Sequence, residues 1–217
     1  MKGLLIKDIR LLMNQGKMLF LMLIAVSLML SVMGVASPLF VVSYITIIFS
    51  FFTSSTISYD EYDNCYLFLM ALPVTRKSYV NEKYLFGLLT TIIAWLVGVV
   101  VGAILLLAGK EHANSLDWIG QCVMCMLVAW LFLSVMIPLR LKFEAEKGKY
   151  INMILLVVCV LIVFVGSQMS PYLPGHIVAF FASFGKGGIL LLSVVITVAA
   201  MIVSYAFSCH IMKRKQF

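Results

Sequence analysis

Six long apolar runs, separated by short charged segments, constrain this chain more than any other feature of its sequence. The runs cover about residues 18–35, 38–58, 84–108, 118–139, 151–168 and 187–208. A helix needs about 20 predominantly apolar residues to cross the hydrocarbon core of a bilayer. Charged residues make up only 12% of the 217 residues, about half of what a soluble domain carries. We therefore expect an all-α integral membrane protein with six transmembrane helices.

The distribution of basic residues between the runs predicts the orientation of the protein in the membrane. Fourteen lysines and arginines fall on one side, whereas the other side holds only Lys110 and Lys186. The fourteen are Lys2, Lys7, Arg10, Lys17, Arg76, Lys77, Lys83, Arg140, Lys142, Lys147, Lys149, Lys213, Arg214 and Lys215. Cytoplasmic loops of membrane proteins carry an excess of Lys and Arg. Both termini are therefore expected in the cytoplasm.

Residues 1–17 have the pattern of a helix that lies along the membrane surface. On a helical wheel, apolar side chains gather on one side, and Lys7, Arg10 and Lys17 gather beside them on another. Such a helix binds at the interface of an anionic leaflet. We expect an interfacial helix over 1–17 and a single transmembrane domain over 18–217. The alternative is a charged leader that only orients the first span.

A second unusual segment, residues 171–185, lies between the fifth and sixth runs. Pro171 and Pro174 precede the apolar stretch 177–184, and a glycine-rich stretch follows it. Eight apolar residues are too few to span a bilayer. A short apolar piece between helix breakers is typical of a re-entrant segment, which we expect here on the external side. The alternative is one long, bent sixth span.

The sequence holds no residues with the spacing of a catalytic, nucleotide-binding or metal site. Its three histidines are isolated, and neither a His-Glu-x-x-His pair nor a phosphate-binding loop occurs. All nine acidic residues lie outside the apolar runs, whereas ion-coupled pumps use charged groups within the membrane. The net charge of +7 falls in short loops, so it is a topology signal and does not indicate nucleic acid as a partner.

The segment between the second and third runs, residues 59–83, has more internal order than a simple linker. An acidic cluster comes first, a short apolar helix over 66–71 follows, and Leu72-Pro73 then forces a turn. Thr75 has the position of a cap for a second helix. The basic and acidic residues at 76–83 would give that helix one polar face. Long loops with structure of their own are usually functional, and a short helix below the bilayer suits docking to a cytoplasmic partner.

The order of these features resembles the permease subunits of type-2 ABC exporters, and is closest to the small bacterial six-span permeases. The most specific part is Leu72-Pro73-Val74-Thr75-Arg76-Lys77, followed by Glu82-Lys83-Tyr84 at the start of the third run. The resemblance covers nearly the whole chain. It implies a half-transporter in the bacterial plasma membrane, in which two permeases pair as a homo- or heterodimer. Each would bind a cytoplasmic ATP-binding subunit that holds ATP and Mg²⁺, so that this chain binds no cofactor.

The resemblance also implies roles for individual segments. The loop at 59–83 would contain the coupling helix that docks the ATPase, and the N-terminal helix would be the connecting helix, with Lys7 and Arg10. The candidate coupling residues are Asp60, Glu61, Asp63, Tyr66, Phe68, Leu69, Leu72, Pro73, Arg76 and Lys77. Peptide export and antimicrobial-peptide resistance are common themes among the small permeases. An amphipathic peptide or lipid-like substrate is therefore expected.

Two other functions remain as alternatives. One is a non-transporting membrane scaffold or sensor that holds a cytoplasmic partner through 59–83, and the other is a membrane enzyme, against which the missing catalytic groups weigh.

Gly98 and Gly102 form a small-x-x-x-small pair in the third run. Such pairs let helices approach closely, but they are frequent in membrane helices, so this pair is a weak signal of a packing contact with another span and a weaker one of a contact with a second permease.

Overall fold

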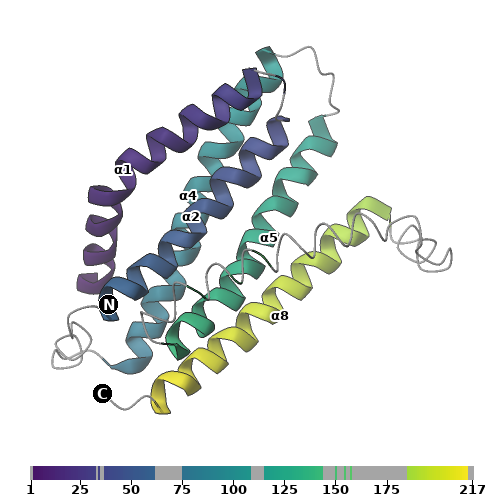
Figure 1. Ribbon diagram of the computed structural model, residues 1–217. Helices are drawn as coiled ribbons and strands as arrows, with labels where there is room; N and C mark the ends of the chain where they lie inside the picture. Colours follow the sequence, from purple (N-terminus) through teal and green to yellow (C-terminus); the bar gives the residue numbers. More distant parts are fainter. Residues whose placement is uncertain are drawn as a thin grey trace.

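The computed structural model describes residues 2–32, 34, 37–61, 75–108, 115–143 and 185–214, together with residues 150, 154 and 157. The regular elements in these ranges are all α-helices: α1 (Lys2–Val32), α2 (Pro38–Glu61), α4 (Arg76–Ala108), α5 (Ser115–Lys142) and α8 (Gly185–Arg214). They pack side by side as an elongated bundle (Figure 1). The predicted all-α architecture is confirmed.

Four of the described helices are long and apolar enough to cross a membrane. These candidate spans are Pro38–Glu61, Arg76–Leu107, Asp117–Lys142 and Gly187–Arg214. They contain the second, third, fourth and sixth apolar runs, so the protein is a multi-pass membrane protein. Nearly all of the fifth run at 151–168, apart from residues 154 and 157, and nearly all of the segment at 171–185 lie outside the described residues. Six spans and a re-entrant segment therefore stay predictions.

The N-terminal segment and the first apolar run form one helix, α1, and not two separate elements. Its ribbon bends near the N-terminal end (Figure 1). In this N-terminal part, Leu4 and Asp8 are buried against the bundle, whereas Ile6 and Met13 are exposed. Arg10 is exposed as well. The outer surface thus combines apolar and basic groups, the combination that an interfacial helix presents to lipid.

Helices α2 and α4 form the most closely packed pair, and glycines of α4 allow the close approach. A Cβ atom at Gly98 would lie 3.2 Å from the Cα of Val42 in α2, and one at Gly102 would lie 3.2 Å from the carbonyl oxygen of Pro38. Side chains at these positions would push the helices apart. The predicted packing contact of Gly98 and Gly102 is confirmed, and its partner is α2 of the same chain.

All five helices meet in one hydrophobic cluster, which lies near the first residue of α4 and the last residues of α2, α5 and α8. Its buried members are Leu4, Ile57, Tyr79, Val80, Tyr84, Leu133, Ile137, Leu141 and Met212. Protein interiors are close-packed, so the side chains of this cluster fit together in one arrangement. The cluster fixes the relative positions of the helix ends on which the charged residues lie.

Candidate functional site: a buried charged cluster that joins α1, α2 and α4

The ends of three helices bring charged residues together at one end of the bundle. Lys7 and Asp8 lie in the second turn of α1, Asp60 lies in the last turn of α2, and Glu82 and Lys83 follow the first turn of α4. Helix α4 runs antiparallel to α2, because Gly87 lies against Thr53 while Gly98 lies against Val42. The start of α4 is therefore beside the end of α2. We call the five charged residues Lys7, Asp8, Asp60, Glu82 and Lys83 the charged cluster.

Lys83 is the central group of the charged cluster. Its side chain is fully buried, and its ammonium group forms ion pairs with Asp8 and with Asp60, the latter at 2.8 Å. Thr56 Oγ1 lies 3.4 Å from the same nitrogen, and the ring of Tyr79 lies 5.2 Å from it. A buried ammonium group is tolerated only when it is paired and hydrogen-bonded, and an aromatic face adds further attraction.

Asp60 receives donors from all sides of its carboxylate. The Tyr79 hydroxyl donates to Oδ2 over 3.0 Å, Lys83 pairs with the same oxygen, and Lys7 donates to Oδ1. The residue is only 2% exposed. Because every neighbouring donor is fixed by a helix, the position of Asp60 depends on α1 and α4 as much as on α2.

The pairs cross between helices, so that α1 is held at two points. Lys7 joins α1 to Asp60 of α2, and Asp8 joins α1 to Lys83 of α4. Lys7 also lies 3.2 Å from Asp8 and is partly exposed. Removing one partner of a buried ion pair leaves an uncompensated charge and costs about 3–5 kcal/mol. The charged cluster therefore holds α1, α2 and α4 together at this end of the bundle.

Neighbouring contacts attach α5 and α8 to the same end of the bundle. Arg140 in the last turn of α5 is buried, and its Nε donates to Ser54 Oγ of α2 over 3.0 Å. Arg76 Nη1 donates to the carbonyl oxygen of Lys213 over 2.8 Å and to that of Met212 over 3.3 Å. Cations that bond the last carbonyls of a helix stabilise its C-terminal end. Arg76 thus caps α8.

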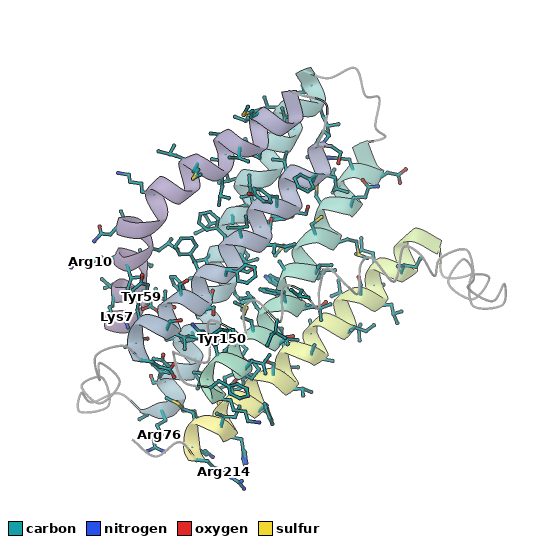
Figure 2. All side chains as sticks on the ribbon, viewed as in Figure 1. Lys7, Arg10, Tyr59, Arg76, Tyr150 and Arg214 are labelled. Atoms are coloured by element: carbon teal, nitrogen blue, oxygen red, sulfur yellow. The ribbon has the colours of Figure 1, made fainter. Side chains whose placement is uncertain are left out.

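The structure describes six of the twelve predicted coupling and connecting residues. Asp60 and Lys7 belong to the charged cluster, Arg76 caps α8, and Glu61 is partly buried at the end of α2. Lys77 and Arg10 are exposed. Figure 2 shows Lys7 and Arg10 on the N-terminal part of α1, near Tyr59 of α2, and Arg76 near Arg214 at the end of α8. The other six, Asp63, Tyr66, Phe68, Leu69, Leu72 and Pro73, lie outside the described residues.

The start of α4 confirms the predicted cap and shows where the polar residues of the helix lie. Thr75 is the predicted cap, because its hydroxyl accepts from the Ser78 backbone N–H over 3.2 Å. Of the residues predicted to give this helix a polar face, Arg76 and Lys77 are exposed, whereas Glu82 and Lys83 are buried. Helix α2 continues to Glu61 and α4 begins at Arg76, so the charges at 60, 82 and 83 lie within packed helices and not in a solvated loop.

Two members of the charged cluster could not be recognised as such from the sequence. In the sequence, Asp8 is one of the acidic residues outside the apolar runs, and Glu82 is one charge of a polar helix face. A weak signal existed for Asp8, which lies one helical turn after Leu4 and one before Leu12; Leu4 is buried and Leu12 packs partly buried against the core. Residues four apart share a helix face.

The charged cluster holds three helices together through paired charges and hydrogen bonds. Among the residues that the structure describes, no group of three His, Cys, Asp or Glu side chains is arranged to hold a metal ion.

A model of the family described as ABC-2 family transporter protein matches residues 3–213, which include every member of the charged cluster. A search of the curated proteins found no match.

Proposed function

This chain belongs to the ABC-2 family of transporter proteins, as its transmembrane permease component, and we propose that it exports an amphipathic peptide or a lipid-like substrate. ABC-2 permeases work with ATP-binding subunits, so the chain itself is not catalytic and ATP hydrolysis takes place in a separate subunit. The proposal concerns three further points: the substrate, the place where the ATPase docks, and the assembly.

We place ATPase docking on residues 66–83, with the apolar side chains at 66–71 as anchors. The observation that supports this is the position of the charged cluster. The chain leaves α2 one residue after Asp60 and enters α4 at Arg76, two turns before Lys83. A force applied by the ATPase to the segment between these helices therefore acts on both sides of the cluster and, through Lys7 and Asp8, on α1.

The N-terminal part of α1 would act as the connecting helix. Lys7 lies within the charged cluster and Arg10 is exposed on the same part of α1. Exposed arginine on such a helix can meet either the ATPase or anionic lipid headgroups. Rim charges of this kind mainly set orientation and association rate, while buried apolar anchors contribute most of the binding energy.

The proposed assembly holds two permeases, identical or different, in the bacterial plasma membrane with both termini in the cytoplasm. The start of α1 and the end of α8 lie toward the same end of the bundle (Figure 1). The start of α4 and the ends of α5 and α8 lie at this same end of the bundle, and they carry the basic residues Arg76, Lys142, Lys213 and Arg214. An excess of basic residues at one end supports a cytoplasmic position for that end.

The proposed substrate class rests on the apolar character of the spans. The chain contains 14 methionines and 15 phenylalanines, and flexible thioethers and aromatic rings adapt to variable apolar partners. Large apolar side chains such as Leu96, Val100 and Ile202 are exposed on the described helices. These features favour an amphiphile over an ion or a sugar, whose recognition needs fixed polar groups.

The test is a double substitution in the proposed anchor, Phe68→Ala with Leu69→Ala. We expect the variant to insert normally but to lose the ATPase on co-purification in mild detergent, or to hydrolyse ATP without export. The matched control is Leu85→Ala with Leu89→Ala, which truncates two exposed side chains of α4 and should leave both readouts unchanged. Normal export together with a retained ATPase in the anchor variant would contradict this docking site and favour the N-terminal helix.

A further inference from the structure

Helix α5 contains a proline shortly before its end, and this proline removes one hydrogen bond of the helix. Pro138 lies inside α5 (Ser115–Lys142). Proline has no backbone N–H, so the carbonyl oxygen of Ser134, one turn earlier, loses its donor within the helix. Helical bonding resumes beyond the proline, because the Phe143 N–H donates to the carbonyl oxygen of Leu139 over 3.2 Å. Pro138 is therefore a point at which α5 can bend.

A hydroxyl group of the neighbouring helix takes the place of the missing N–H. Helices α5 and α8 lie side by side (Figure 1), and Ser204 Oγ of α8 donates to the carbonyl oxygen of Ser134. Both serines are buried, and Leu133 and Ile137 beside Ser134 belong to the hydrophobic cluster. A carbonyl group without a hydrogen bond is costly in such surroundings. The bond from Ser204 therefore stabilises the helix at its weakest point.

The hydrogen bonds around Ser204 have one consistent direction. A carbonyl oxygen can only accept, so the single hydroxyl hydrogen of Ser204 goes to Ser134. The hydroxyl of Tyr84, 2.5 Å from Ser204 Oγ, must then donate to Ser204. Ser208 Oγ lies 2.9 Å from the same tyrosine oxygen and must in turn donate to it. Tyr84 of α4 therefore orients the Ser204 hydroxyl toward α5.

Ser204 also has an alternative acceptor in its own helix. Hydroxyl groups in helices commonly donate to the carbonyl oxygen one turn earlier. In α8, Thr197 Oγ1 donates to the carbonyl oxygen of Ser193 over 2.8 Å in this way. The corresponding acceptor for Ser204 is the carbonyl oxygen of Ala200. A rotation about χ1 of Ser204 would therefore replace a bond between two helices by a bond within α8.

The two parts of α5 on either side of Pro138 are attached to different helices. Before the proline, α5 is joined to α8 through Ser134. Beyond it, Arg140 Nε donates to Ser54 Oγ of α2 over 3.0 Å, and Nη2 donates to Ser58 of the same helix. A bend at Pro138 would therefore let the end of α5 follow α2 while the longer part stays beside α8.

We propose that α5 has a hinge at Pro138 and that the Ser204 hydroxyl controls it. While Ser204 donates to Ser134, the two parts of α5 are held in line and α8 is fastened to the hinge. When the hydroxyl turns to Ala200, this bond is lost and the end of α5 moves with α2. The bent form is the minor one, because the Ser134 carbonyl oxygen then lacks its donor. The inference concerns the membrane helices alone and does not depend on the substrate or on where the ATPase docks.

The experiment measures hydrogen–deuterium exchange of residues 139–141 in the purified permease in lipid nanodiscs. The N–H groups of these residues bond to carbonyl groups before the proline, so they exchange when the hinge bends. Ser204→Ala should speed this exchange about tenfold. Pro138→Ala should slow it below the wild-type rate, because an alanine N–H satisfies Ser134 permanently. The matched control is Thr197→Val, which removes a buried hydroxyl that donates within α8 and should leave the rate unchanged.

A double-substitution cycle on thermal unfolding gives an independent test. Ser204→Ala should lower the unfolding midpoint by a few degrees when made alone, and should have no effect in the Pro138→Ala background. Three results would each overturn the hinge. They are equal losses in the two backgrounds, exchange in Pro138→Ala that is no slower than in the wild type, and exchange in Thr197→Val as fast as in Ser204→Ala.

Tyr84→Phe keeps the proposal testable without changing the proline. It removes the donor that orients Ser204 and retains the buried ring. Exchange of residues 139–141 should therefore become faster than in the wild type but less so than in Ser204→Ala. Combining the two substitutions should add nothing to Ser204→Ala, since both act through one hydroxyl group. Additive effects would contradict this path from α4 to the hinge.

Discussion

Lys83 of α4 pairs with Asp8 of α1, 75 residues earlier in the chain, and both side chains are fully buried. Each charge also has a neighbour of opposite sign on its own helix, Lys7 for Asp8 and Glu82 for Lys83, but only the pair between Asp8 and Lys83 joins α1 to α4. The pair therefore fixes where the N-terminal part of α1 lies on the bundle. It also places a strong contact between the two segments that we expect to respond to the ATPase, the start of α4 and the N-terminal helix.

Replacing Lys83 with methionine should strongly destabilise the folded permease. The substitution keeps the length of the side chain but removes the buried cation from both Asp8 and Asp60, which then share only the partly exposed Lys7, at a cost of about 3–5 kcal/mol. Denaturant unfolding in detergent micelles measures the loss. The control Lys77→Met, on an exposed position of the same helix, should change stability by less than about 0.5 kcal/mol. Equal stabilities for the two variants would show that Lys83 is not needed.

A milder change at the same place is Tyr79→Phe. It removes the hydroxyl that donates to Asp60 over 3.0 Å and keeps the buried ring. A hydrogen bond to a charged group contributes about 1.5–3 kcal/mol, so we expect a loss of that order in the same unfolding assay. Tyr59 is 43% exposed, and Tyr59→Phe is the matched control that should be close to neutral.

Arg76→Gln should loosen the C-terminal end of α8. The arginine bonds the carbonyl oxygens of Met212 and Lys213, and a cation at a helix C-terminus contributes about 0.3–1 kcal/mol. Hydrogen–deuterium exchange should therefore speed up in the last turn of α8 even when no ATPase is present. Arg214→Gln is the control. Unchanged exchange in Arg76→Gln would leave ATPase docking as the better role for this residue.

Gly98→Leu should separate α2 from α4. A Cβ atom at Gly98 would already lie 3.2 Å from a backbone atom of Val42, which cannot move aside as a side chain can. Overpacking of this kind costs typically about 1–3 kcal/mol or more. A Cβ atom at Gly120 in α5 would have no neighbouring atom within 4 Å. Gly120→Leu therefore measures the effect of a leucine in a helix without a close contact. Thermal unfolding of the two variants gives the comparison.

Features that depend on local sequence could be predicted well. The spans follow from runs of apolar residues, and the cap at Thr75 follows from its position after Leu72-Pro73 and before a polar helix. The close approach at Gly98 follows from small residues four apart. In each case the residues that cause the feature lie within a short stretch of the sequence. The feature can therefore be predicted without knowing which other helix contacts it.

The burial of the charged cluster could not be predicted in the same way. A charge in a sequence is ordinarily found in water, and a lysine such as Lys83 becomes buried only when partners from other helices meet it. Its partners Asp8 and Asp60 come from two different helices, and hydropathy contains no information about that pairing. The same holds for the helix ends. Hydropathy ends the second run at residue 58, whereas α2 continues to Glu61 and carries Asp60 into contact with Lys7 and Lys83.

The long separation between Asp8 and Lys83 also imposes an order on biogenesis. During synthesis α1 leaves the ribosome before α4, and Asp8 has no lysine of α4 to meet until the chain has grown past residue 83. Its other close cation, Lys7, is its own neighbour in the chain and cannot join it to another helix. The contact between the N-terminal part of α1 and α4 can therefore form only after α4 has been made, so that an earlier segment of the chain reaches its final place only once a later one has arrived.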